Sequence, residues 1–104
     1  MTIGVYRVSN VVTGDFYIGS SNNVERRFHE HATAMHSGKH PKKQMALHWN
    51  LYGKSAFRFE ILEVVPNLRD LKTRESQLTQ RLQPTYNTLR VYHRPEVYRK
   101  KEAS

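Results

Sequence analysis

The sequence contains no cysteine, and only two of its 104 residues are aspartate. The lack of cysteine excludes a disulfide framework, a thiol nucleophile and a thiolate zinc site, and so few aspartates make a carboxylate-rich site for two metal ions unexpected. No apolar run approaches the roughly 20 residues of a membrane-spanning helix, and the start does not resemble a secretory signal. We therefore expect a single intracellular domain, and a monomer is the favoured state. Neither a membrane nor a small-molecule cofactor is an expected partner.

Acidic residues are scarce relative to basic ones. The chain has 17 Lys and Arg against 9 Asp and Glu, which gives a formal net charge of +8. Such an excess attracts polyanions through their phosphates. The basic residues are scattered among aromatic ones, whereas a membrane-surface helix would gather them on one face. The expected partner is therefore a nucleic acid.

The order of the predicted elements indicates a mixed α/β domain. Strands are expected over residues 3–12, 16–19 and 56–65, and helices over 23–37, 41–52 and 68–82. Asn22 and Glu25 would form a capping box at the first helix, Pro41 would open the second, and Gly38 and Gly53 would end them. Residues 1–89 would form the folded domain, and residues 90–104 a basic, flexible tail.

Two short triplets, Gly4-Val5-Tyr6 and Tyr17-Ile18-Gly19, flank ten residues rich in β-branched side chains. Valine, isoleucine and tyrosine are good strand formers, and Thr13-Gly14-Asp15 is a turn sequence, so an ordinary hairpin could explain the stretch. Whether the two triplets only build a hairpin or also have a chemical role depends on the rest of the sequence.

The third predicted helix carries an acidic residue in an apolar stripe. At about 100° per residue, Glu75 falls between the leucines of one face: Leu68, Leu71, Leu78 and Leu82. A carboxylate that faces a core is costly unless it is paired, hydrogen-bonded or bound to a metal. Two interpretations are open here, namely a buried salt bridge with an arginine and a ligand for Mg²⁺ or Mn²⁺.

The first predicted helix separates two neighbouring arginines. Its apolar stripe places Arg26 away from the core, whereas Arg27 and His31 flank the stripe: Val24, Phe28, Ala32 and Met35. Arg27 could bind a phosphate with its planar guanidinium, although a surface arginine is the commoner case.

Most of the histidines are expected at the surface. These are His29, His36, His48 and His93. His31 would lie beside the core and His40 just before the second helix. No HExxH pattern or other close pair of zinc ligands is present, so a zinc site is not expected.

In order, the two triplets, Arg27, Glu75 and a Tyr86-Asn87 pair resemble the GIY-YIG nuclease family over about residues 3–89. Within this family, the sequence most resembles the catalytic domain of phage and intron homing endonucleases. These homing enzymes carry a further DNA-binding domain after a long linker, whereas this sequence stops soon after Leu89.

This resemblance implies a small, mainly antiparallel three-stranded sheet flanked by helices in the order β-β-α-α-β-α. It also implies hydrolysis of DNA phosphodiester bonds that depends on Mg²⁺ or Mn²⁺. The implied catalytic residues are Tyr6, Tyr17, Arg27, His31, His40 and Glu75, with Glu75 as the metal ligand. Arg27, Lys42, Lys43 and Asn87 are the candidate contacts to nucleic acid.

The identity of the general base stays open. By the resemblance Tyr6 is the candidate, but a phenol has a pKa near 10, so its deprotonation at neutral pH costs about 4 kcal/mol unless positive charge is close. Arg27 and a metal ion could supply that charge, or His31 or His40 could accept the proton. As a nuclease, the chain could be a stand-alone phage or mobile-element enzyme or the catalytic part of a longer homing enzyme. The alternatives are a non-catalytic nucleic-acid-binding module, a restriction-type enzyme, and a nuclease of single-stranded or branched DNA.

Overall fold

The structure is a computed structural model that describes residues 1–87. Its main elements are β1 (Gly4–Asn10), β2 (Phe16–Ser21), α1 (Val24–His36), α2 (Lys43–Tyr52), β3 (Phe57–Val64) and α3 (Leu71–Leu82). The strands form one antiparallel sheet in the order β2-β1-β3. The predicted fold class and element order are thereby confirmed. His93 and the predicted tail at 90–104 lie outside the described residues.

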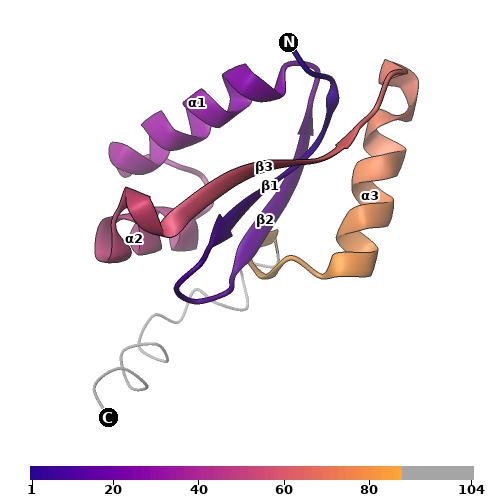
Figure 1. Ribbon diagram of the computed structural model, residues 1–104. Coiled ribbons are helices and arrows are strands. Elements are labelled where there is room, and N and C mark those ends of the chain that lie inside the picture. The colour runs from indigo at the N-terminus through magenta and orange to yellow at the C-terminus, as the bar shows by residue number, and fades with distance from the viewer. Residues whose placement is uncertain (88–104) are drawn as a thin grey trace.

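Helices cover both faces of the sheet. Helices α1 and α2 lie on one face and α3 on the other (Figure 1). Because side chains alternate along a strand, Val5 of β1 points toward α3, whereas Tyr6 and Val8 point toward α1 and α2. The domain therefore has two cores, separated by the sheet.

The first two helices begin slightly later than predicted. Asn23, not Asn22, is the N-cap of α1, and its side chain accepts a hydrogen bond from the Arg26 amide. The carboxylate of Glu25 does not close a capping box, because it accepts hydrogen bonds from Thr2. Helix α2 begins at Lys43, and Pro41 stays in the preceding bend. Gly38 and Gly53 end their helices with positive φ, as predicted.

An irregularity in β3 changes the alternation of its side chains after Ile61. Tyr6 pairs with Ile61, but the preceding residue Val5 pairs with Glu63, so Leu62 has no partner in the ladder. Leu62 packs against the core beneath α3, and the next residue, Glu63, also faces α3, where it bonds Arg74, whereas strict alternation would turn it to the opposite face. One extra residue in a strand has this effect because it shifts the following side chains to the opposite faces.

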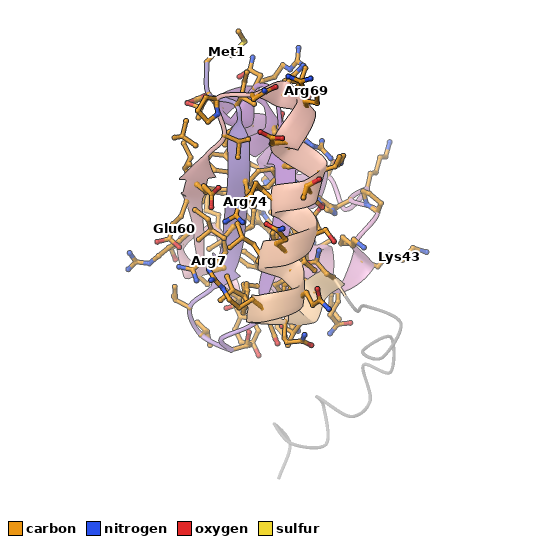
Figure 2. All side chains as sticks on the ribbon, turned by 90° about the vertical axis from the view of Figure 1, so that its right-hand side faces the viewer. Met1, Arg7, Lys43, Glu60, Arg69 and Arg74 are labelled. Carbon is orange, nitrogen blue, oxygen red and sulfur yellow. The ribbon has the colours of Figure 1, made fainter. Side chains whose placement is uncertain are left out.

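Ion pairs tie the α3 side together. Arg74 of α3 holds Glu63 of β3 through two hydrogen bonds of 2.7 and 2.6 Å. Arg7 of β1 pairs with Glu60 of β3 at 2.7 Å, and both pairs lie on the face that Figure 2 turns toward the viewer.

Within residues 1–87, no helix is both long enough and apolar enough to cross a membrane.

Candidate active site

The two tyrosines of the triplets lie together on the face of the sheet beneath α1. Tyr6 pairs with Gly19 across β1 and β2, and the Tyr6 and Tyr17 ring centroids are 6.2 Å apart. A Cβ at position 19 would lie 2.6 Å from the Tyr6 hydroxyl oxygen and 2.9 Å from the Tyr17 ring. Only glycine therefore leaves room for the two rings. The spacing of the triplets does more than build a hairpin, because it brings two phenols together.

Two histidines extend from the Tyr6 hydroxyl into the protein. His31 Nε2 lies 2.6 Å from Tyr6 Oη, and His31 Nδ1 lies 2.6 Å from His40 Nε2. The His40 ring is held in turn by the Lys42 backbone amide, which donates to Nδ1 at 2.9 Å. His31 is 2% exposed and His40 is 5% exposed. The expected position of His31 beside the core is confirmed, and both residues are buried.

Burial keeps these four rings uncharged at neutral pH. It raises the pKa of Tyr6, with a further rise from Tyr17 and a partial opposing effect of Arg27. Burial and the charge of Glu75 raise the pKa of Tyr17. Burial, His40 and Arg27 lower the pKa of His31 to about 3. Burial, Arg27 and Lys42 lower the pKa of His40 to about 4. In the free protein, Tyr6 therefore holds its proton.

Arg27 lies at the open side of the tyrosine pair. It is close enough to lower the pKa of both Tyr6 and Tyr17, whereas Arg26 points into solvent as predicted. The Arg27 guanidinium also forms an ion pair of 3.0 Å with Glu30, one turn further along α1. Glu30 was not among the predicted site residues, although a spacing of three residues on a helix could have suggested the pair.

Glu75 lies at the edge of the leucine stripe and not within it. Leu71 and Leu78 are buried, but Leu68 and Leu82 are exposed, and the Glu75 side chain is 25% exposed. Glu75 is thus only partly buried and is hydrogen-bonded, so it avoids the cost of an unpaired carboxylate that faces a core. The alternative of a buried pair with arginine is wrong, because the ionic partner of Glu75 is Lys72, at 3.4 Å and 84% exposed.

Ser20 connects Glu75 to the tyrosine strand. Its hydroxyl donates a short hydrogen bond to the Glu75 carboxylate, and Ser20 immediately follows the second triplet on β2. Glu75 is also near enough to Tyr17 for its charge to act on the phenol. Ser20 was not among the predicted site residues, although its position next to Gly19 could have suggested it. Residues from β1, β2, α1 and α3 thus converge around the edge strand β2.

The donor set around Glu75 suits a weakly held, hard divalent cation. A partly exposed carboxylate and a neighbouring hydroxyl are oxygen ligands of the kind that Mg²⁺ and Mn²⁺ prefer. Among residues 1–87, no group of three or more His, Asp or Glu side chains is placed to hold a metal ion. Water and substrate oxygens would have to provide the remaining ligands.

Asn87 supports the site from the open edge of the sheet. Its amide nitrogen donates to the Ile18 carbonyl and its amide oxygen accepts from the Ile18 N–H, both at 2.9 Å. Asn87 thus takes the place of a neighbouring strand beside β2. This side chain therefore has a structural role, and the second N–H and the second lone pair of its amide leave its expected contact with nucleic acid a prediction.

The two candidate lysines differ in their relation to the site. The Lys42 ammonium lies 6.0 Å from the Tyr17 ring centroid, so its positive charge borders the tyrosine pair. Lys43 is exposed at the start of α2, across the molecule from the Arg7–Glu60 pair (Figure 2). Only Lys42 therefore belongs to the immediate surroundings of the tyrosines.

His48 was expected at the surface, and this is wrong. It is buried on α2, where its ring contacts Gln44 at 3.1 Å and the Tyr86 hydroxyl at 2.7 Å. Asn10 donates to the same hydroxyl at 3.2 Å. This second polar cluster links α2 and β1 to the segment after α3. Its members are distant in the sequence, so the spacing of residues along α2 could not predict it. His29 and His36 are exposed, as predicted.

Comparison with known proteins assigns this arrangement to a family. The GIY-YIG catalytic domain matches residues 2–87, which is almost the whole described part. The chain belongs to the GIY-YIG family. The resemblance carried by the two triplets, Arg27 and Glu75 is thereby confirmed.

The relatives of this GIY-YIG domain include phage and intron endonucleases. Intron-associated endonuclease 1 of Enterobacteria phage T4 is 30% identical over 71 residues, which are 68% of this chain and 29% of that protein. A mutant catalytic domain of the intron endonuclease I-TevI matches with a TM-score of 0.72 and 26% identity, over 80% of this chain and 86% of that one. A second structure of the I-TevI catalytic domain gives a TM-score of 0.73 at 24% identity, over 82% of this chain and 92% of that one, which supports the fold. The chain thus spans under a third of the curated T4 relative.

Proposed function

We propose that this domain is an endonuclease that hydrolyses phosphodiester bonds of DNA with the help of Mg²⁺ or Mn²⁺. The observation that carries the proposal is the convergence of Tyr6, Tyr17, Arg27 and Glu75 around strand β2 in a member of the GIY-YIG family. A base, a cation and a carboxylate within one open site match the needs of phosphodiester hydrolysis.

In this proposal Tyr6 takes the proton of the attacking water, and Tyr17 positions that water or the phosphate. The burial that raises the pKa of Tyr6 makes the phenol a poor base in the free protein. Positive charge nearby reverses this effect, because it favours the tyrosinate. Arg27 provides one such charge and also faces the phosphate, where it would neutralise the negative charge that develops in the transition state.

Glu75 would hold the divalent cation, with the Ser20 hydroxyl beside it. A bound cation would polarise the phosphate and stabilise the leaving oxygen. With a single carboxylate among the ligands, binding should be weak and should tighten when the substrate phosphate joins. The exposed Lys72 ammonium now pairs with this carboxylate, and it can swing aside at small cost because exposed ion pairs contribute little.

The DNA backbone would run past Arg27 and Lys42, with Lys43 as an outer contact. These residues come from α1 and from the start of α2, next to the tyrosines. Lysine and arginine contacts to phosphates position a duplex but do not specify its sequence. We therefore expect this domain by itself to discriminate only modestly between DNA sequences, and to act inside the cell that holds its substrate.

One experiment tests the proposal directly. Labelled duplex, single-stranded and branched DNA are incubated with the protein in Mg²⁺, in Mn²⁺ and in EDTA, and the cut products are measured. Glu75→Gln keeps the size of the side chain but removes its charge, so we expect cleavage to fall about 10²-fold or more while DNA binding persists. Glu60→Gln, which removes the same charge on the opposite edge strand, is the matched control and should cut normally.

The results also separate this proposal from its rival. Cutting that survives EDTA, or that is unchanged in Glu75→Gln, contradicts the role of Glu75. Salt-sensitive DNA binding without cutting under any condition would instead identify a non-catalytic nucleic-acid-binding module on the same fold.

A further inference from the structure

A buried line of hydrogen bonds connects a backbone amide to the Tyr6 hydroxyl. It runs from the Lys42 N–H to His40 Nδ1 (2.9 Å), from His40 Nε2 to His31 Nδ1 (2.6 Å), and from His31 Nε2 to Tyr6 Oη (2.6 Å). The His31 and His40 ring planes differ by only 20°, which suits an N–H that lies in the plane of one ring and points at the nitrogen of the other. Each ring nitrogen therefore has one partner.

The first bond of this line fixes the direction of all the others. A backbone N–H can only donate, so His40 Nδ1 must accept and carries no hydrogen. A neutral imidazole has one N–H, so His40 carries its hydrogen on Nε2 and donates it to His31 Nδ1. By the same argument His31 carries its hydrogen on Nε2 and donates it to Tyr6 Oη. The low pKa values of His31 and His40 support the neutral state of both rings.

The opposite direction would place two hydrogens against each other. If Tyr6 donated to His31, then His31 would donate to His40 Nε2, and the single hydrogen of His40 would sit on Nδ1. That hydrogen would face the Lys42 N–H across 2.9 Å. Two donors in a buried position lose their hydrogen bond and repel each other, which is costly.

We infer that the Lys42 amide, acting through His40 and His31, orients the Tyr6 hydroxyl: His31 donates to Tyr6, and the hydrogen of Tyr6 points toward the side of Tyr17 and Arg27. His31 and His40 are thus positioning residues that stabilise a tyrosinate, and neither accepts the Tyr6 proton. In the reaction, that proton is lost to solvent past the half-buried side chains of Tyr17 and Arg27, since Tyr6 itself is buried. The Tyr6 oxygen then takes a proton from the attacking water, and both histidines end as they began.

The first test needs no cleavage and so stands apart from the proposed nuclease function. In ¹⁵N-labelled protein at pH 7, NMR correlations between ring nitrogens and ring hydrogens identify the tautomer of each histidine. We expect His31 and His40 both to carry hydrogen on Nε2 alone. The exposed His29 and His36 should show the averaged signals of rings that exchange with water, and they serve as internal controls. A hydrogen on Nδ1 of either His31 or His40 overturns the inference.

The second test asks whether His31 must be a base. In His31→Gln the side-chain amide can still donate a hydrogen bond to Tyr6, but it cannot take up a proton. We expect this variant to cut within about 10-fold of the wild-type rate and to keep the wild-type rise of rate with pH, whereas His31→Ala should lose about 100-fold or more. If His31→Gln is as inactive as His31→Ala, or loses that pH dependence, His31 is a proton acceptor and the inference fails.

A matched variant controls for the loss of a buried histidine. His48→Gln makes the same change in the second polar cluster, where the ring bonds Gln44 and Tyr86, and it should leave the rate near that of the wild type. All rates are taken per folded molecule, with the folded fraction measured by circular dichroism. If the wild-type chain does not cut DNA at all, the proposed function fails, and the tautomers of His31 and His40 still decide the inference.

Discussion

The two sides of the sheet bury different kinds of side chain. The α3 side has a small core of aliphatic side chains: Val5, Ile18, Val65, Leu71 and Leu78. The side beneath α1 and α2 also buries apolar residues, but it encloses two polar clusters, one around Tyr6 and His31 and one around His48 and Tyr86. Neighbouring residues of one strand, Val5 and Tyr6, thus enter environments of opposite character.

This difference separates stability from chemistry. Buried polar groups are costly unless they form hydrogen bonds. Among the described residues, every buried side-chain nitrogen or oxygen has a partner, so the polar side avoids that cost. The aliphatic side holds α3 in place, and α3 in turn carries Glu75 to the edge of β2. Each side should therefore respond differently to substitution.

The largest effect is expected from removal of one oxygen on the polar side. Tyr6→Phe keeps the ring but removes the candidate base, and cleavage should fall about 10²- to 10⁴-fold. The lost partner of His31 should lower the free energy of unfolding by only about 1–3 kcal/mol. Nicking assays and urea unfolding measure the two quantities, and a variant that cuts at the wild-type rate would end the role of Tyr6.

The aliphatic side provides the contrast to this variant. Leu78→Ala should lower the free energy of unfolding by about 2–5 kcal/mol, because it leaves a cavity beneath α3. Its rate per folded molecule should stay close to wild type. A large loss of rate in the folded variant would mean that the two sides are not independent.

The next largest effect is expected at the glycine between the two phenols. In Gly19→Ala the new methyl group would lie 2.6 Å from the Tyr6 hydroxyl, so the ring must move. A shift of about 1 Å in a catalytic group can lower a rate about 100-fold. Gly14→Ala, in the β1–β2 turn, is the control: its positive φ costs stability, but open space surrounds the new methyl group and cleavage should persist. Equal cleavage by both variants would contradict the crowding at position 19.

Acid should weaken the polar side before the aliphatic one. Unfolded histidines take up protons below about pH 6.5, whereas folded His31 and His40 stay neutral until about pH 3 and 4. The unfolded state then binds more protons, so the free energy of unfolding falls as the pH falls through this window. The slope approaches about 1.4 kcal/mol per pH unit for each histidine. Urea unfolding between pH 6.5 and 4.5 measures it.

His31→Gln tests the origin of this slope. It removes one titrating ring, so its stability should depend less on pH than that of the wild type. A wild-type stability that is flat between pH 6.5 and 4.5 would show that these rings are not held neutral by burial.

The smallest effect is expected at the rim of the site. Glu30→Gln removes the carboxylate that now pairs with Arg27 and leaves the guanidinium free for a phosphate. DNA affinity at low salt should rise about two- to five-fold, since exposed ion pairs are weak, and salt should reduce the gain. Fluorescence anisotropy with labelled duplex measures the affinity. Glu60→Gln removes the same charge far from Arg27 and should have less effect, so an equal gain in both variants would indicate net charge alone.

Local rules predicted much of the fold. The turn at Thr13-Gly14-Asp15, the strand propensities around it and the helix stops at Gly38 and Gly53 are all properties of short segments. The apolar stripe of α1 placed Arg26 in solvent correctly because helical geometry alone fixes that face.

The wrong predictions share a cause, which is that each depends on a partner distant in the chain. The bulge in β3 arises from its pairing with β1, and it turns Glu63 to the same side as Leu62, toward α3. His48 is buried because Tyr86, 38 residues away, supplies a hydrogen-bond partner. Glu75 is partly exposed because α3 packs on the sheet through Leu71 and Leu78, whereas Leu82 stays exposed.

The sequence by itself determined the type and order of the elements, the family, and the set of tyrosines, arginine and glutamate from which a site could form, because propensity, periodicity and motif are local. Only the tertiary structure decided that Asn87 hydrogen-bonds to β2 and that Ser20 hydrogen-bonds to Glu75. It also decided that a series of hydrogen bonds runs from the Lys42 amide to Tyr6. Hydrogen bonds between distant segments depend on position and direction in space, and these exist only after the chain has packed.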